Sequence, residues 1–179
     1  MLPLFIATYR FDRFDGDTWN KYVEWAKIPN LVEVVSVDGS LCEPIVREFV
    51  DEDWKHNVHE NCRLNYFYDL EYLIRRVAGV TRRNILGLYR NPDAHIDSAP
   101  AGGDFVFMGY DLIEESTHIS ALTNCGGFPE TFSKDELNKY GLLFEFARAR
   151  EVREWLPVHN PDEPHAYCEM YAIWRLSET

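Results

Sequence analysis

The chain is poor in basic residues for its length. Its 179 residues include 18 lysines and arginines against 30 aspartates and glutamates, which gives a formal net charge of −12. Duplex nucleic acids and anionic membrane surfaces are both bound through Lys and Arg side chains. The charge balance therefore argues against nucleic acid and against a membrane as partners. It is compatible with a basic protein partner, with a metal ion, or with solubility alone.

Long apolar runs and targeting features are also missing. No stretch reaches the roughly 18–20 apolar residues that a membrane helix needs. The first ten residues, MLPLFIATYR, lack a positively charged start, and their apolar run is too short for a signal peptide. The four cysteines are widely spaced and form no CxxC pair: Cys42, Cys62, Cys125 and Cys168. We therefore expect free thiols and a cytoplasmic protein.

Motifs of the common catalytic classes are absent. The sequence contains no GxSxG, HExxH or GxGxxG motif. The pair Gly102 and Gly103 precedes an expected strand and lacks the lysine of a P-loop, so it does not predict a phosphate site. No cofactor is expected on these grounds.

Aromatic residues are abundant, at 15% of the chain, and apolar residues make up 46%, which favours an ordered core. The length fits one domain over residues 1–179. Apolar spacing predicts helices over residues 17–27, 66–78 and 142–155, with Asp17 capping the first and Pro157 ending the third. A capping box formed by Ser133 and Glu136 predicts another short helix. Residues 45–58 have a mixed pattern that includes a helical face.

Strands are predicted where apolar and β-branched residues concentrate, over residues 2–9, 31–37, 84–89 and 167–176. Residues 105–113 and 119–123 predict a hairpin at the centre of the sheet, joined by a polar turn. The regular alternation of strand and helix in a doubly wound fold is missing. The predicted fold is therefore α+β, a mostly antiparallel sheet packed with three to four helices.

Charge is segregated along the chain. Residues 63–90 hold six basic and two acidic side chains, whereas residues 91–133 hold no basic and seven acidic ones. One interpretation is that the two segments lie side by side and neutralise each other. The other is that residues 91–133 form a surface for a basic partner. The contacts predicted for such a surface are Tyr110, Asp111, Glu114, Glu115, His118 and Asn124.

The nearest approach to a metal-binding pattern is His56-x2-His59-x2-Cys62. On a helix the two histidines would share a face, but Cys62 would point about 120° away from them. A zinc site would then need a turn and a distant fourth ligand. Exposed histidines beside a buried cysteine are the more ordinary expectation, and no metal is predicted.

A thiol nucleophile is a second chemical possibility. Cys125 ends a predicted strand and is followed by two glycines, whose amides could hold an oxyanion. His118 lies seven residues earlier, and a strand rises about 3.3 Å per residue, so the two side chains should be about 20 Å apart. His165, in the connector before the last strand, is the remaining candidate base.

The lack of catalytic motifs favours a non-catalytic binding protein. We expect a small acidic cytoplasmic protein that captures a basic protein partner, in the manner of toxin-immunity proteins. The alternative is an enzyme of unrecognised type, with a thiol or histidine-assisted site near Cys125 and His165.

Overall fold

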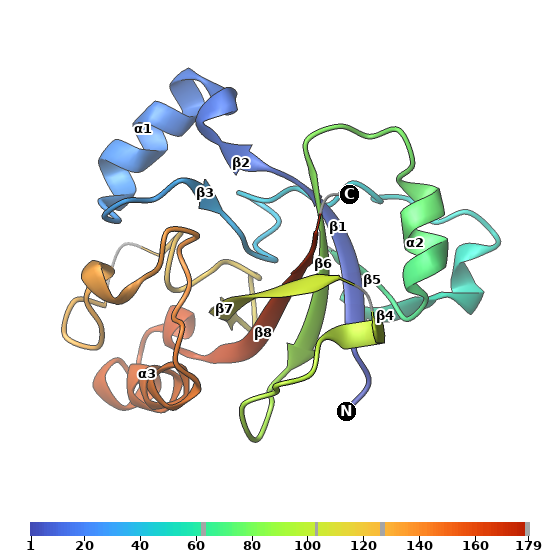
Figure 1. The fold of residues 1–179 in the computed structure, drawn as a ribbon. Helices are drawn as coiled ribbons and strands as arrows, with labels where there is room; N and C mark the ends of the chain where they lie inside the picture. Colours follow the sequence, from blue (N-terminus) through green and yellow to red (C-terminus); the bar gives the residue numbers. More distant parts are fainter. Residues whose placement is uncertain (62–63, 103, 126–127, 178–179) are drawn as a thin grey trace.

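The computed structural model describes residues 1–61, 64–102, 104–125 and 128–177. An antiparallel sheet of six strands, in the order β4-β5-β1-β6-β8-β7, runs through the centre of the molecule, and β2 pairs with β3 in a separate small sheet (Figure 1). The described residues also form three α-helices. The predicted α+β class is correct in this form. None of the described helices is long and apolar enough to cross a bilayer.

The elements have the following bounds. The strands are β1 (Leu4–Tyr9), β2 (Phe11–Asp12), β3 (Glu33–Val34), β4 (Asn57–Asn61), β5 (Leu64–Phe67), β6 (Arg83–Arg90), β7 (Phe105–Glu114) and β8 (Cys168–Leu176). The α-helices are α1 (Asp17–Ala26), α2 (Leu70–Arg76) and α3 (Phe146–His159). Short 3₁₀ turns occupy Arg13–Asp15, Asp53–Lys55, Pro100–Gly102, Lys134–Glu136 and Pro164–Ala166.

Side chains of the sheet alternate between two buried layers, as the two-residue period of a strand requires. In β1, Phe5 and Ala7 join one apolar cluster, whereas Leu4 and Ile6 join the other. Helix α2 contacts β1, and α3 contacts β7 and β8, on the side of the first cluster. Irregular chain around residues 35–37 packs in the second cluster. Because both faces are covered, a polar side chain of the sheet interior needs hydrogen-bonding partners.

Helix α1 and the β2–β3 sheet form a small unit beside the six-stranded sheet (Figure 1). The rings of Phe11, Trp19 and Tyr22 pack together there, with centroid separations of 5.1 to 5.9 Å. The hydroxyl of Tyr22 also donates to the carbonyl of Thr123 at 2.8 Å. Aromatic burial therefore holds α1 against both its own strands and the chain near residue 123.

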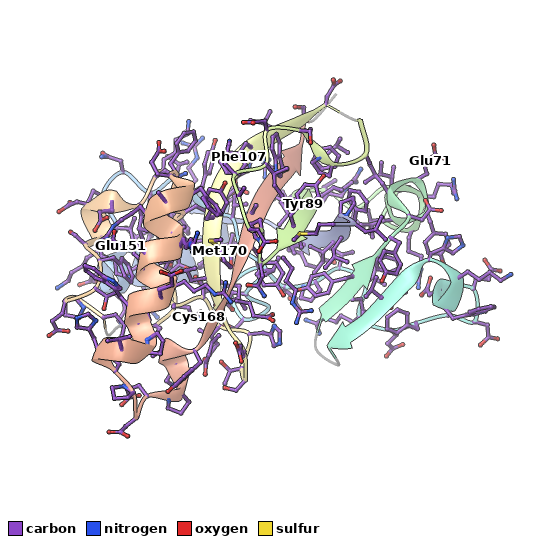
Figure 2. The ribbon with its side chains drawn as sticks, turned by 90° about the horizontal axis from the view of Figure 1, so that it is seen from below. Glu71, Tyr89, Phe107, Glu151, Cys168 and Met170 are labelled. Carbon is purple, nitrogen blue, oxygen red and sulfur yellow. The ribbon has the colours of Figure 1, made fainter. Side chains whose placement is uncertain are left out.

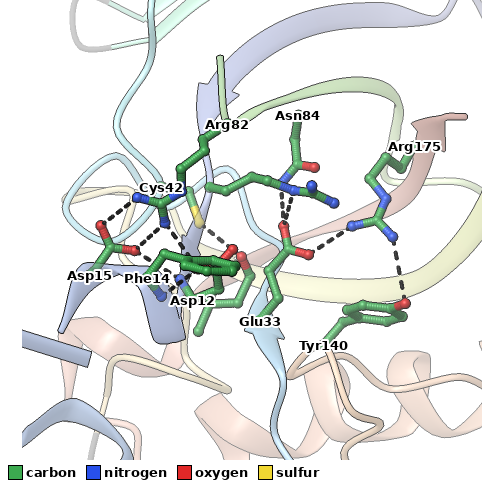
Figure 3. Close-up of polar contacts among 11 residues, drawn as sticks. Asp12, Phe14, Asp15, Glu33, Cys42, Arg82, Asn84, Tyr140 and Arg175 are labelled. Carbon is green, nitrogen blue, oxygen red and sulfur yellow. Dashed lines mark hydrogen bonds and ion pairs between the residues drawn. The ribbon is translucent and has the colours of Figure 1, made fainter. Parts of the chain in front are cut away.

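A buried carboxylate, Glu33 of β3, links the small unit to the large sheet (Figure 3). It accepts hydrogen bonds from Arg10 at 3.2 Å, from Asn84 of β6 at 2.7 Å and from Arg175 of β8 at 2.8 Å. The guanidinium of Arg175 also lies 5.0 Å from the ring centroid of Tyr140. Two arginines and an amide thus compensate the burial of one charge.

The predicted central hairpin is wrong. Strand β7 lies at the edge of the sheet and pairs with β8 from Phe105 to Glu114, whereas residues 119–123 form a single bridge, Ile113 to Ser120, followed by a turn. The long aromatic strand β8 offers β7 far more pairing than five residues can. The returning chain still covers the outer edge of β7, because the N–H of Ala121 donates to the carbonyl of Leu112.

The helix predictions need two corrections at their starts. Helix α2 begins at Leu70 because Asp69 caps it and accepts from the N–H of Tyr72, and the residues before Asp69 belong to β5 and a turn. Helix α1 has Gly16, and not Asp17, in the N-cap position.

Other boundaries also differ from prediction. Helix α3 begins at Phe146 and continues past Pro157, since a proline removes only its own N–H donor and the N–H of Asn160 still reaches the carbonyl of Leu156. Residues 45–58 contain no α-helix, and the predicted strand 31–37 is reduced to β3. The capping box of Ser133 and Glu136 is confirmed, on a 3₁₀ turn.

Candidate binding surface

Three of the predicted contact residues are buried on β7 and cannot touch a partner. Residues Tyr110, Asp111 and Glu114 are each at most 1% exposed. The prediction that they anchor a surface is corrected here, because their polar atoms are used within the fold. Glu115 is exposed just after the strand.

Asp111 lies at the centre of a buried hydrogen-bond network. Its carboxylate accepts from the hydroxyl of Ser36 at 2.5 Å, the hydroxyl of Ser120 at 2.6 Å and the N–H of Leu112 at 2.8 Å. Burial raises the pKa of Asp111 from 3.8 to about 6, although the hydrogen bonds from Ser120 and Ser36 act in the opposite direction. This group joins β7 to the chain around residue 36.

A second buried carboxylate, Asp38, organises the region where Asn124 and His118 lie. Asp38 accepts from the N–H of Ser120 at 2.9 Å, from the amide of Asn124 at 2.8 Å and from the hydroxyl of Ser40 at 2.7 Å. His118 has a positive φ of 58° and lines a pocket of about 450 Å³ together with Asp38 and Ser40. The side chain of Asn124 thus stabilises the fold, and His118 lines the pocket.

Glu114 and His165 are within hydrogen-bonding distance of each other. The Nδ1 atom of His165 lies 2.8 Å from Glu114, which also accepts from the hydroxyls of Ser116 and Thr117. Burial opposes ionisation, but the two hydroxyls and His165 hold the pKa of Glu114 below its usual value. His165 therefore stabilises a buried carboxylate at the end of β7.

Cys125 is the other catalytic candidate. It is partly buried and lines a pocket of about 430 Å³ with Lys134 and Phe128. Burial raises the pKa of the Cys42 and Cys168 thiols well above the usual value, so these two are inert at neutral pH.

The histidine–cysteine pattern gives no metal centre among the described residues, which contain no group of three or more His, Cys, Asp or Glu side chains able to hold an ion. His56 instead contacts Asp69 at 3.1 Å, and its ring stacks on Tyr72 with centroids 4.0 Å apart. The side chain of His59 and residue Cys62 lie outside the described residues.

Four arginines of residues 63–90 pair with carboxylates outside the acidic segment. The pairs are Arg75 with Glu71 at 3.8 Å, Arg76 with Asp53 at 3.6 Å, Arg82 with Asp12 and Asp15 at 2.9 Å, and Arg90 with Glu169 at 2.6 Å. These pairs do not support mutual neutralisation of the two segments. The exposed carboxylates of the acidic segment are Asp93, Asp97, Asp104, Glu115 and Glu130.

Two of these carboxylates, Asp93 and Asp97, lie in the loop that carries His95 to a cluster of aromatic rings. The loop between β6 and β7 meets the chain that leads into α3, and we call the result the acidic–aromatic surface, formed by Asp93, His95, Asp97, Phe107, Phe144 and Glu145. The ring of Phe107 lies 5.6 Å from that of His95 and 5.8 Å from that of Phe144. Phe144 is 57% exposed. In Figure 2, Phe107 lies beside the sheet on the side where α3 runs.

The imidazole of His95 in this surface is held by contacts on both of its nitrogens. The hydroxyl of Tyr110 lies 2.6 Å from Nδ1 of His95, and Nε2 of His95 lies 3.2 Å from Asp97. Burial, together with the carboxylates of Asp97 and Glu145, raises the pKa of Tyr110 to about 12. Tyr110 therefore stays a neutral donor and fixes the imidazole.

The six residues of this surface include three carboxylates and no lysine or arginine. Among the described residues, neither Asp97 nor Glu145 forms an ion pair with a lysine or arginine. Asp93 is close enough to raise the pKa of Arg150 on α3, which pairs mainly with Glu154. An exposed phenyl ring flanked by unneutralised carboxylates can bind a guanidinium or ammonium group through its face and its edges.

Four of the six residues of this surface lie in the predicted acidic segment, but none of the six was among the predicted contacts. Asp93 and Asp97 fall in the predicted acidic segment, whereas Phe144 and Glu145 lie beyond it and were assigned to a helix. No pattern in the sequence marks Phe144 as exposed, because it lies in an apolar stretch that was assigned to a helix. A scan against protein-family models and searches of curated proteins and of solved structures found no match to the chain.

Proposed function

We propose that the protein is a non-catalytic binding protein that captures a basic protein partner through the acidic–aromatic surface, in an immunity-like role. The observation that carries the proposal is the exposed Phe144 ring, which precedes Glu145 in the chain and packs on Phe107. The carboxylates of Asp97 and Glu145 on the same surface lack lysine or arginine partners within the described residues. The net charge of −12 adds a long-range attraction for a basic partner and speeds the encounter.

The expected mode of recognition uses both the exposed ring and the carboxylates of this surface. An arginine or lysine of the partner would lie over the ring of Phe144, with its charged end directed to Asp97 and Glu145. Desolvated aromatic anchors of this kind dominate interface energies, and the surrounding charges contribute mainly to specificity and association rate.

Affinity capture from the lysate of the native host tests the proposal. The double variant Asp97→Lys and Glu145→Lys reverses the charge of the surface, and the matched control, Asp51→Lys with Glu52→Lys, makes the same change at exposed positions near the opposite edge of the sheet. A basic protein should be retained by the wild type and by the control, and lost from the surface variant. Raising salt from about 50 to about 500 mM should also release it.

A truncation of the aromatic anchor separates shape from charge. Phe144→Ala should weaken the captured complex by about tenfold or more, as expected for a central anchor. Trp54→Ala removes an exposed ring near the opposite sheet edge and should leave affinity unchanged. Equal retention of the same proteins by all these variants would refute the proposed surface.

A further inference from the structure

The pocket beside Cys125 has a lining unlike the rest of this acidic protein. Its volume of about 430 Å³ lies within the range of small-molecule sites. Apolar rings line it from two elements: Trp25 from α1, and Phe128 and Phe132 from the chain before the Ser133 capping box. The charged residues that line it are Lys27 and Lys134, and the described lining contains no aspartate or glutamate.

Lys134 is held at this pocket without a carboxylate. Its ammonium donates to the carbonyl of Leu122 at 2.6 Å and lies 5.6 Å from the ring centroid of Phe132. Within the described residues it enters no ion pair, although the chain has an excess of acidic groups. Burial lowers the pKa of Lys134, while the nearby Cys125 sulfur raises it. An ammonium has three donors, so two remain for a ligand.

Trp25 adds a second unexplained feature. It is 51% exposed, with its ring 6.0 Å from that of Tyr22, and it forms the α1 side of the pocket. The last carbonyls of α1 carry partial negative charge at the same side. An anionic group would therefore sit at the Lys134 side, and an apolar ring would lie toward Trp25.

We propose that this pocket binds a small planar aromatic molecule that carries one anionic group, with the anion on Lys134 and the ring between Trp25 and the phenylalanines. The apolar rings provide burial and stacking for the flat body. The partly desolvated ammonium provides a charge-assisted hydrogen bond that a neutral molecule does not gain. The site shares no residue with the acidic–aromatic surface, so it is independent of any basic partner.

Two fluorescent probes of the same framework test the proposal on the full chain. 1-Anilinonaphthalene-8-sulfonate carries the anionic group, and N-phenyl-1-naphthylamine lacks it. The wild type should bind the sulfonate saturably at one site. Lys134→Met should weaken the sulfonate by about tenfold, the value of a hydrogen bond to a charged group, and should change the neutral probe much less. Lys134→Arg should restore sulfonate binding.

A matched lysine serves as the control. Lys139 lies 5.2 Å from the ring centroid of Tyr140, a geometry similar to that of Lys134, but it does not line the pocket. Lys139→Met should leave both affinities unchanged. Equal weakening of both probes by Lys134→Met, or an equal effect of Lys139→Met, would overturn the proposal.

Protection of Cys125 locates the probe without any mutation. Saturating sulfonate should slow alkylation of Cys125 by iodoacetamide severalfold, as measured by peptide mass spectrometry of the wild-type protein. Alkylation at an unchanged rate in the saturated protein would also overturn the proposal, because the probe would then be bound elsewhere.

Discussion

The buried carboxyl of Asp111 should make the protein more stable as the pH falls from neutrality toward 5. Its pKa in the folded protein, about 6, lies above its ordinary value of 3.8. The folded state therefore binds a proton before the unfolded state does, and protonation favours folding throughout the interval between the two values. Protonation is compatible with the network because the hydroxyl of Ser36 or Ser120 can rotate to accept.

The size of the effect follows from the shift of the pKa. A shift of about 2 units corresponds to about 3 kcal/mol at 1.36 kcal/mol per unit. Linkage distributes this energy over pH, so that about 1 kcal/mol should be gained by about pH 5 and about 2 kcal/mol by about pH 4. Carboxylates whose pKa is lowered, such as Glu114, stabilise the folded protein at neutral pH. Their contribution is lost only as the pH falls below the ordinary pKa of a carboxyl group, so it does not mask the rise in stability above pH 5.

Urea unfolding of the wild type and of Asp111→Asn across this pH range measures the effect. The difference between the two free energies of unfolding isolates Asp111, because every other titratable group is present in both proteins. The difference should rise in favour of the wild type as the pH falls. Glu115→Gln, which removes an exposed carboxyl nearby, should show no such slope above pH 5. A flat difference between pH 7 and pH 5 would refute the desolvation argument.

Three further perturbations test other parts of the fold. Glu33→Gln should lower the free energy of unfolding by about 3 kcal/mol in chemical denaturation, because two arginines lose their buried partner, whereas the exposed Glu71→Gln should match the wild type. Gly109→Ala places a Cβ 2.7 Å from a backbone carbonyl at φ +137° and should cost about 3 kcal/mol, against about 1 kcal/mol for Gly79→Ala, whose Cβ meets open space. Native-state alkylation should modify Cys125 far faster than the two buried thiols, and comparable rates would contradict the burial described.

The local sequence pattern was sufficient to predict those elements whose own residues show apolar alternation or a capping motif. Strands β1, β6 and β8 and the capping box at Ser133 lie where they were predicted, because apolar alternation and cap chemistry are written in neighbouring residues. Pairing is a competition between distant segments, and it was predicted wrongly. Strand β7 forms its ladder with β8, which begins more than fifty residues after β7 ends. The nearby residues 119–123 contribute a single bridge to β7.

The candidate site shows the same division between local and distant information. Local sequence predicted Asp111 to be a surface residue. Its burial depends on the hydroxyl of Ser36, which lies 75 positions away in the chain. The partner of Asp38 at Ser120 is 82 positions distant, and no local signal marks either pair. Asp93 and Asp97 lie in the predicted acidic segment, because charge can be read from the sequence directly, but the predicted contacts did not include them.

The burial of acidic groups changes what the net charge means for function. Asp38, Asp111 and Glu114 contribute to the formal charge, but hydroxyl, amide and imidazole partners use their lone pairs inside the protein. The surface along β7 is therefore less acidic than the sequence indicates. A basic partner of the kind proposed would be attracted mainly to the carboxylates that stay exposed. Charge reversal at Asp97 and Glu145 should consequently disrupt capture more than the same reversal at exposed carboxylates elsewhere, even though the change in net charge is identical.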